Sequence, residues 1–214
     1  MFKLYSAARS SASFRIRIAL HLKGLPFEVV AVDLRKGDQF KDDFRTLNPQ
    51  ELVPLLDDGA AHLTQSLATM EYLEEKYPQP PLLPHAPADR AYVRSVALAV
   101  ACEIHPLNNL RVLRYLVKEM GLADAKKDQW YRHWVEQGLA QIESGLVAQR
   151  RTGRYTFGDQ VTLADVCIVP QIFNARRYDC RLDHVPTVMR IFDACMQLAA
   201  FENARPEKQP DFTE

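Results

Sequence analysis

The chain has 214 residues, 47% of them hydrophobic and 25% charged, so it can bury a sizeable core as one large domain or as two closely packed ones. Its 27 basic and 27 acidic side chains cancel, which excludes a global electrostatic attraction to nucleic acid or to an anionic membrane. There is neither an apolar run of the roughly 20 residues that a membrane helix needs nor a signal peptide, and we expect a cytoplasmic protein.

The beginning of the chain predicts strands and helices in alternation. Residues 2–5 form an apolar strand, a helix follows over 13–23 and ends at Gly24, and a second strand spans 27–34. A strand, a helix and a strand in this order favour a parallel pair of strands with a right-handed crossover between them.

The next residues complete a small α/β layer. A polar stretch over 37–47 predicts a loop with a short helix. Residues 52–64 predict a hairpin, because Asp58 and Gly59 form a favoured turn. A further helix then begins, with Ser66 as its expected N-cap, because a serine hydroxyl can accept a hydrogen bond from an amide of the first turn.

A proline-rich segment over 77–87 separates this layer from the rest of the chain. Proline can continue neither a helix nor an interior strand, so the segment is the predicted linker. All that follows Asp89 has helical patterning, and Pro106 is expected to kink the first long helix. We therefore predict two domains, an α/β domain over 1–80 and an all-helical domain over 88–214.

The later helices are predicted from apolar residues at helical spacing. Two sets mark two of these helices: Val135, Leu139, Ile142 and Leu146, then Val188, Ile191, Cys195 and Leu198. Between them, Thr162 and Asp165 have the spacing of a capping box, and we interpret both as structural. The polar, proline-containing tail after Arg205 is expected to be a surface segment.

The four cysteines are Cys102, Cys167, Cys180 and Cys195. They form no C-x-x-C pair and no metal-binding spacing with the histidines, which argues against a disulfide framework and against a zinc site. We expect no metal. If the protein uses a thiol in chemistry, the thiol comes from outside the chain.

The junction between the first strand and the first helix concentrates hydroxyls and cations. It includes Arg9, Ser10, Ser11, Ser13 and Arg15. A helix start has backbone N–H groups without intrahelical partners and carries a partial positive charge. Such a place can hold an anion, including a thiolate. We therefore predict the reaction centre here.

Several stretches resemble the zeta class of the cytosolic glutathione transferases. The run SSASFRIRIAL over 10–20 is similar to the signature of that class, in which a Ser-Ser-Cys run precedes an aromatic residue and Arg-x-Arg-Ile-Ala-Leu. Other matching segments lie at 48–54, 65–66, 104–109, 165–171 and 209–211. The resemblance implies a thioredoxin-like α/β N-terminal domain that binds glutathione, followed by an all-α helical C-terminal domain that binds the substrate.

The resemblance also implies glutathione as the cofactor and places its contacts. Pro54 would be a cis-proline that exposes the backbone of Val53 to the cysteinyl part of glutathione, and Gln65 with Ser66 would hold the γ-glutamyl carboxylate at a helix start. The full set of implied glutathione contacts is Ser10, Ser11, Ala12, Ser13, Phe14, Arg15, Gln39, Val53, Gln65, Ser66, His105, Asn109 and Arg111.

The activity implied is glutathione-dependent cis–trans isomerisation of maleylacetoacetate in the breakdown of tyrosine and phenylalanine. The thiolate would add to the double bond, the bond would rotate, and elimination would restore it as trans. Ser10 is the first choice for the hydroxyl that stabilises the thiolate, and Ser11 the second. Because the substrate is a small dianion, Arg9 and Arg177 match arginines that the family places beside it. Arg111 resembles the bacterial maleylpyruvate type.

Ala12 and Phe14 depart from the family pattern, which has cysteine and commonly tryptophan at these places. The missing cysteine counts against a thiol-transfer role and should spare isomerisation. Alternatives are a maleylpyruvate isomerase, a general conjugating transferase and, in a different class, a non-catalytic glutathione-fold binding module. The family also implies a homodimer whose ligands are glutathione and a dicarboxylate cis-enone, without nucleic-acid or membrane partners.

Overall fold

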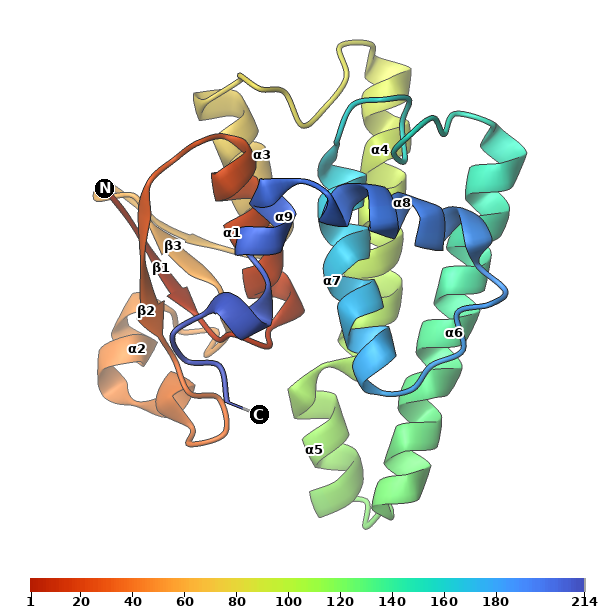
Figure 1. Ribbon diagram of the computed structural model, residues 1–214. Helices are drawn as coiled ribbons and strands as arrows, with labels where there is room; N and C mark the ends of the chain where they lie inside the picture. Colours follow the sequence, from red (N-terminus) through yellow and green to blue (C-terminus); the bar gives the residue numbers. More distant parts are fainter. Residues whose placement is uncertain (214) are drawn as a thin grey trace. The chain divides into compact units, whose positions relative to one another are not determined.

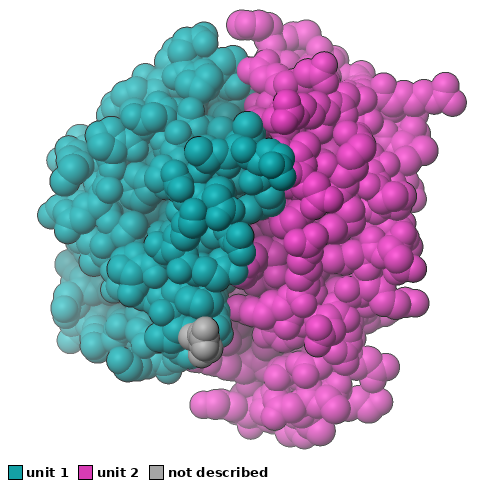
Figure 2. Space-filling model, viewed as in Figure 1, with its two compact units in different colours: residues 1–82, 196–214 teal, residues 83–195 magenta. Residues whose placement is uncertain are grey.

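The computed structural model describes residues 1–213, which divide into two compact units (Figures 1 and 2). The first unit contains 1–82 together with the C-terminal residues from 196 onwards, and the second contains Leu83–Cys195. The C-terminal residues therefore group with the α/β layer, although the sequence places them in the helical domain. The physical reason is local packing, since the guanidinium of Arg17 donates to the carbonyl of Ala204 at 2.9 Å.

The first unit is built on a four-stranded mixed sheet with the strand order β2-β1-β3-β4. Its strands are β1 (Phe2–Ser6), β2 (Phe27–Ala31), β3 (Leu55–Asp57) and β4 (His62–Thr64). The central strand β1 pairs in parallel with β2 and antiparallel with β3, and β4 completes the hairpin. The predicted parallel pair and the predicted hairpin are both confirmed.

Helices cover both faces of this sheet. Figure 1 shows α1 (Ser11–Leu22) and α3 (Ser66–Lys76) side by side over one face, and the short α9 (Ala199–Asn203) packs against α1. On the other face lie the 3-10 helix η1 (Asp38–Phe40) and α2 (Asp42–Leu47).

The alternation of the strands explains this two-sided core, since neighbouring side chains point to opposite faces of a sheet. Leu4 and Leu56, which face each other across β1 and β3, are fully buried. The next pair in the register, Tyr5 and Leu55, instead joins Phe44 of α2 in a separate apolar cluster.

The second unit is helical. Its helices are α4 (Pro87–Leu98), the π-helical segment η2 (Ala99–Ile104), the 3-10 helix η3 (His105–Asn108), α5 (Leu110–Lys118), α6 (Asp124–Gln149), α7 (Leu163–Arg177) and α8 (Pro186–Met196). The four apolar residues predicted for the helix after α5 are buried in α6. Close packing of η2 on α6 depends on Gly138, because an added Cβ would stand 2.4 Å from Cγ1 of Ile104.

The long helix that Pro106 was expected to kink is instead interrupted. After α4 the backbone widens into η2, tightens into η3 and restarts as α5. Proline lacks the N–H that an α-helix needs and crowds the preceding turn. The chain therefore ends one helix and begins another.

Three further expectations have definite outcomes. The capping box of Thr162 and Asp165 at the start of α7 is confirmed. The N-cap of α3 is Gln65, so the assignment to Ser66 is wrong by one residue. Leu198 was assigned to the helix that forms α8 but lies beyond its end. None of the helices in residues 1–213 is long and apolar enough to cross a membrane.

Candidate active site

The start of α1 places Ser10 as its N-cap. The Ser10 side chain accepts a hydrogen bond from the backbone N–H of Ser13 at 3.2 Å, and its own N–H donates to the carbonyl of Ala7 at 3.0 Å. Ser11, Ser13 and Phe14 are buried in the first turn, and Ala12 is half-buried. A serine hydroxyl that accepts one N–H still has its own proton to donate. Ser10 can therefore serve both the helix and a bound anion.

Two arginines of α1 are almost fully buried. Arg15 is 1% exposed and Arg17 is fully covered. Arg17 donates to the side chain of Ser6 at 2.9 Å and to the carbonyl of Ala8 at 2.9 Å, so it fixes the loop that leads to Ser10. Burial lowers the pKa of Arg17 to about 9, although the nearby carboxylate of Asp211 opposes this shift.

The loop before β3 is organised by Asn48, which is 1% exposed. Its amide nitrogen donates to the carbonyl of Leu52 at 2.7 Å, and its side-chain oxygen accepts from the N–H of Gln50 at 3.0 Å. The bond between Val53 and Pro54 is cis, as the family resemblance implied. The predicted contact residue Val53 thus lies in a loop that is fixed from within.

The start of α3 is contacted by Arg15 of α1, whose guanidinium is only partly hydrogen-bonded among the described residues. Gln65 has a φ of 65°, a conformation uncommon outside glycine. Its side chain donates to the Gln50 side chain at 2.9 Å. The next residue, Ser66, is buried and accepts from Nη1 of Arg15 at 3.1 Å. Nε and Nη2 of Arg15 are also buried and have no hydrogen-bond partner among the described residues.

Arg15 and the start of α3 therefore suit an anionic group. A buried cation without full pairing is costly, and a carboxylate at a helix N-terminus is favoured by the orphan amides and by the helix dipole. The glutathione γ-glutamyl carboxylate predicted for Gln65 and Ser66 has this chemistry. The observed donors thus suit the cofactor predicted from the sequence.

Two other residues of the first unit that were predicted to belong to the site, Gln39 and Arg9, lie outside the starts of α1 and α3. Gln39 lies in η1, is 5% exposed, and its Oε1 has no hydrogen-bond partner among the described residues. Arg9 is exposed, donates to the carbonyl of Thr213 at 2.6 Å, and stands over the Phe212 ring with 5.1 Å to its centroid. Arg9 is therefore already held by the C-terminal segment.

The remaining predicted residues belong to the second unit. His105 begins η3, and Asn109 is the N-cap of α5, where its side chain accepts from the N–H of Arg111 at 3.1 Å. The exposed guanidiniums of Arg111 and Arg177 make no hydrogen bond or ion pair with the described residues, although Arg177 stands 5.1 Å from the Tyr178 ring centroid. Both arginines are thus available to an anion.

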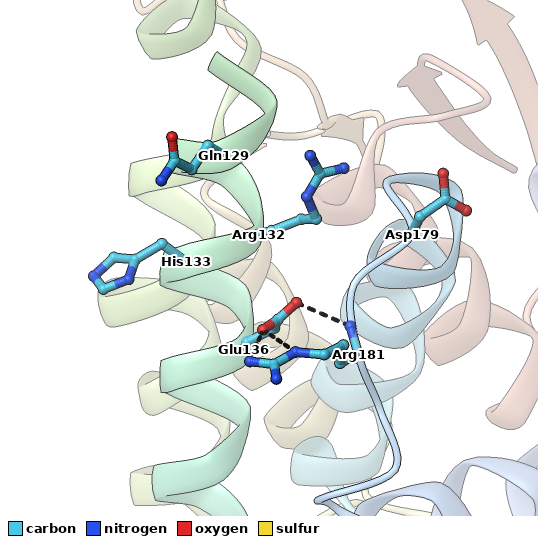
Figure 3. Close-up of a pocket in the computed structure, with 6 residues that line it drawn as sticks. All are labelled: Gln129, Arg132, His133, Glu136, Asp179 and Arg181. Atoms are coloured by element: carbon cyan, nitrogen blue, oxygen red, sulfur yellow. Dashed lines mark hydrogen bonds and ion pairs between the residues drawn. The ribbon is translucent and has the colours of Figure 1, made fainter. Parts of the chain in front are cut away.

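A pocket of about 410 Å³ in the second unit contains none of the predicted site residues (Figure 3). Its lining residues are Gln129, Arg132, His133, Glu136, Asp179 and Arg181. Glu136 accepts from the N–H, Nε and Nη2 of Arg181 at 2.9 to 3.0 Å. Burial pushes the pKa of Glu136 up, but these bonds outweigh it and lower the pKa. Glu136 and Arg181 of this pocket are thus already paired with each other.

Burial makes two of the chain's own thiols poorly suited to nucleophilic chemistry. None of the four cysteines forms a disulfide within the described residues, and three of them are buried. Burial raises the pKa of Cys180 to about 12, and it also raises the pKa of Cys195. Because the thiolate is the reactive form, these buried thiols are inert near neutral pH. This is compatible with an external thiol.

Sequence reasoning missed Asn48, Arg17 and Asp211 as supports of the site. All three stand in segments that match the family, and Arg17 is the second arginine of the Arg-x-Arg run. That run could have suggested that both arginines are buried and bonded. The spacing of apolar residues alone places Arg15 and Arg17 on a helix. It does not predict a hydrogen-bond partner for either side chain.

The chain is similar to known proteins over nearly its whole length. Residues 9–76 match the model of the glutathione S-transferase N-terminal domain. The chain is 46% identical over 210 residues to a probable maleylacetoacetate isomerase of Vibrio cholerae serotype O1, with 97% of both proteins covered.

Two solved structures have nearly the same fold. The holo structure of a maleylpyruvate isomerase, described as a bacterial zeta-class glutathione S-transferase, has a TM-score of 0.97 and 47% identity, and covers 99% of this chain and 100% of its own. A maleylacetoacetate isomerase from Methylobacterium extorquens AM1 with bound malonate and glutathione has a TM-score of 0.96 and 41% identity, with the same coverage.

Proposed function

This chain belongs to the zeta-class glutathione transferases, the family that includes the maleylacetoacetate and maleylpyruvate isomerases, and we propose that it is a glutathione-dependent cis–trans isomerase of maleylacetoacetate. The observation that carries this proposal is the anion site of Arg15 and Ser66 at the α3 start, in the same unit as the hydroxyl-rich start of α1. The protein is accordingly an enzyme.

The first unit is proposed to bind glutathione. Arg15 and Ser66 hold the γ-glutamyl carboxylate, Gln65 contacts the same group, and Val53 pairs with the cysteinyl backbone. When bound, glutathione would supply the sulfur that adds to the substrate's cis double bond and leaves it after rotation. The buried Oε1 of Gln39 offers a further acceptor.

Ser10 is proposed to hold the sulfur as an anion. A free thiol has a pKa of about 8.5, so the site must favour the charged form near neutral pH. Because the Ser10 oxygen already accepts the Ser13 N–H, its hydroxyl proton can be donated to the sulfur. That bond, together with the positive end of α1, lowers the pKa of the thiol. Ser11 is the second candidate for this role.

The substrate is proposed to be a small dicarboxylate. The isomerase from Methylobacterium extorquens, solved with malonate and glutathione, supports this class. We assign substrate carboxylates to Arg9 and Arg177, because a guanidinium binds a carboxylate through two parallel hydrogen bonds. A cation near the substrate oxygens also stabilises the negative charge that develops there when the sulfur adds.

Maleylpyruvate is the second candidate substrate. Its support is the 47% identity to a maleylpyruvate isomerase and the guanidinium of Arg111, which is unpaired among the described residues and which the family resemblance relates to that bacterial type. Arg111 stands in the first turn of α5, where the helix dipole disfavours a cation. An anion bound there would offset this cost.

The test is an absorbance assay of maleylacetoacetate and maleylpyruvate in parallel, with and without glutathione. The variants are Ser10→Ala and Arg177→Ala. Their matched controls are Ser144→Ala on the exposed face of α6 and Arg176→Ala, which removes the adjacent exposed arginine.

We expect turnover only with glutathione and faster turnover of maleylacetoacetate. Ser10→Ala should lower kcat by about 100-fold, as is typical for the loss of one donor to a developing charge, and Arg177→Ala should raise KM. Turnover without glutathione would refute the mechanism. Controls that lose as much activity as the two variants would refute the site assignment.

Three expectations remain predictions. They are a glutathione-binding role for the domain predicted over 1–80, a substrate-binding role for the helical domain predicted over 88–214, and a homodimer located in the cytoplasm. The two domain roles and the homodimer follow from membership of the family.

A further inference from the structure

The C-terminal segment is bonded directly to the loop that carries Ser10. A carboxylate oxygen of Asp211, Oδ2, accepts from the N–H of Ala8 at 2.8 Å. Two residues further on, the carbonyl of Thr213 accepts from Arg9 at 2.6 Å. The segment therefore contacts two successive residues immediately before the N-cap of α1.

The same loop is held from the opposite side by Arg17. Its guanidinium donates to the carbonyls of Ala7 at 3.5 Å and Ala8 at 2.9 Å. Arg17 is fully buried, and Asp211 is the acidic residue that interacts with its charge. Both backbone groups of Ala8 are thus hydrogen-bonded to charged side chains, its N–H to Asp211 and its carbonyl to Arg17.

The contact from Asp211 satisfies a buried backbone amide, that of Ala8. Ala8 is 3% exposed, so without Asp211 its amide would lack a partner in a place that water reaches poorly, which is costly. The loop could recover a partner only by shifting. Any shift at Ala8 is passed to Ser10 within two residues, since the N–H of Ser10 is bonded to Ala7.

We propose that Asp211 is a positioning residue for the reaction centre, holding the Ala8 amide so that Ser10 and Arg9 keep the places from which they act. This inference rests on the proposed function, because it takes Ser10 as the thiol-binding hydroxyl. Asp211 acts through the loop backbone and touches neither the thiol nor the substrate. The adjoining Phe212 supports Arg9 through its ring.

The test compares Asp211→Ala with Asp211→Asn. Asparagine keeps an oxygen that can accept from Ala8, whereas alanine keeps none. Glu207→Gln is the matched control, because Glu207 lies in the same segment but, among residues 1–213, pairs only with Arg205. For each variant the measurements are kcat, KM for both substrates, melting temperature, and the thiol pKa of bound glutathione from its thiolate absorbance.

We expect Asp211→Ala to lower kcat at least about tenfold, because a displacement on the order of 1 Å can cost 100-fold. It should also move the thiol pKa toward the free value of about 8.5. Asp211→Asn should stay within about threefold of wild type, since a neutral acceptor makes a weaker bond of the same geometry. Glu207→Gln should match wild type.

The inference is overturned if Asp211→Ala lowers only the melting temperature and leaves kcat, KM and the thiol pKa unchanged. If Asp211→Ala does not fold, Phe212→Ala decides the question. Phe212→Ala should raise the diacid KM about two- to fivefold, through loss of one cation–π contact, with the thiol pKa unchanged; an unchanged KM overturns the inference.

The thiol titration separates this inference from the proposed function. It needs glutathione alone and no diacid. If wild type ionises bound glutathione but isomerises neither diacid, the proposed function fails, and Asp211 is still judged by whether its loss raises the thiol pKa.

Discussion

At the scale of single residues, the polar atoms that still lack a partner say most about the site. Arg15 satisfies one of its terminal nitrogens on Ser66 and leaves two other nitrogens buried and unpaired within the described chain. An arginine with a purely structural role is expected to donate its N–H groups to backbone carbonyls, as Arg17 does. The contrast between these two arginines, which stand two residues apart in α1, is the physical basis for assigning an anion to Arg15.

We predict that Arg15→Met weakens glutathione binding at least about tenfold. The reason is that hydrogen bonds to charged groups contribute about 1.5–3 kcal/mol each. Calorimetric titration with glutathione gives the dissociation constant. Arg45→Met is the control, since it removes an exposed arginine of the same unit that pairs with Glu51.

The ligand-free stability of Arg15→Met provides an independent check. Removing a buried cation that lacks full pairing should leave the melting temperature unchanged or higher. A variant that binds glutathione like wild type but melts several degrees lower would show that Arg15 holds the fold and leaves the γ-glutamyl carboxylate to other residues.

At the scale of elements, the start of α7 shows how one carboxylate can organise a turn. Asp165 is fully buried and accepts from the N–H and hydroxyl of Thr162 and from the N–H and hydroxyl of Thr156, at 2.6 to 2.9 Å. It thus ties the helix start to the preceding loop. Nothing in this arrangement requires a ligand.

We predict that Asp165→Ala destabilises the protein by about 3 kcal/mol or more. Four donors would lose their acceptor, two of them backbone amides in a buried turn, and each unsatisfied buried group costs roughly 1–3 kcal/mol. Urea unfolding followed by circular dichroism measures the loss. Asp193→Ala on the exposed side of α8 is the control. If Asp165→Ala kept wild-type stability but lost activity, the structural assignment would be wrong.

Local patterns were enough to predict most elements of this protein. Strand alternation, the Asp58–Gly59 turn and the capping box are short-range signals, and each corresponds to an observed element. The interruption between α4 and α5 was harder to predict from the sequence. One proline predicts a disturbed helix, but it does not specify a π-helical segment followed by a 3-10 turn. The N-cap of α3 was misassigned because Gln65, unlike Ser66, has no intrinsic preference for that place.

At the scale of the whole chain, the features missed were contacts between distant residues. Asp211 and Ala8 are separated by 203 positions, and no periodicity reports such a pairing. The tail after Arg205 was predicted as a surface segment, and Glu207 and Lys208 are indeed exposed, whereas Pro206 is buried. The candidate site itself was predicted through family resemblance, since composition and spacing indicated only an anion-binding helix start.

Glutathione should stabilise the whole molecule against heat. A ligand that binds only the native state at 100 times its dissociation constant adds about 2.7 kcal/mol, which for a chain of 214 residues corresponds to a rise in melting temperature of roughly 5–10 °C. S-methylglutathione should also stabilise the protein, though by less than glutathione, because it keeps the γ-glutamyl carboxylate and the cysteinyl backbone but lacks the thiolate that Ser10 is proposed to bind. The dipeptide cysteinylglycine lacks that carboxylate and should give little shift at the same concentration. If it shifts the melting temperature as much as glutathione does, then Arg15 and Ser66 at the start of α3 do not bind the γ-glutamyl group, and the proposed orientation of the cofactor is wrong.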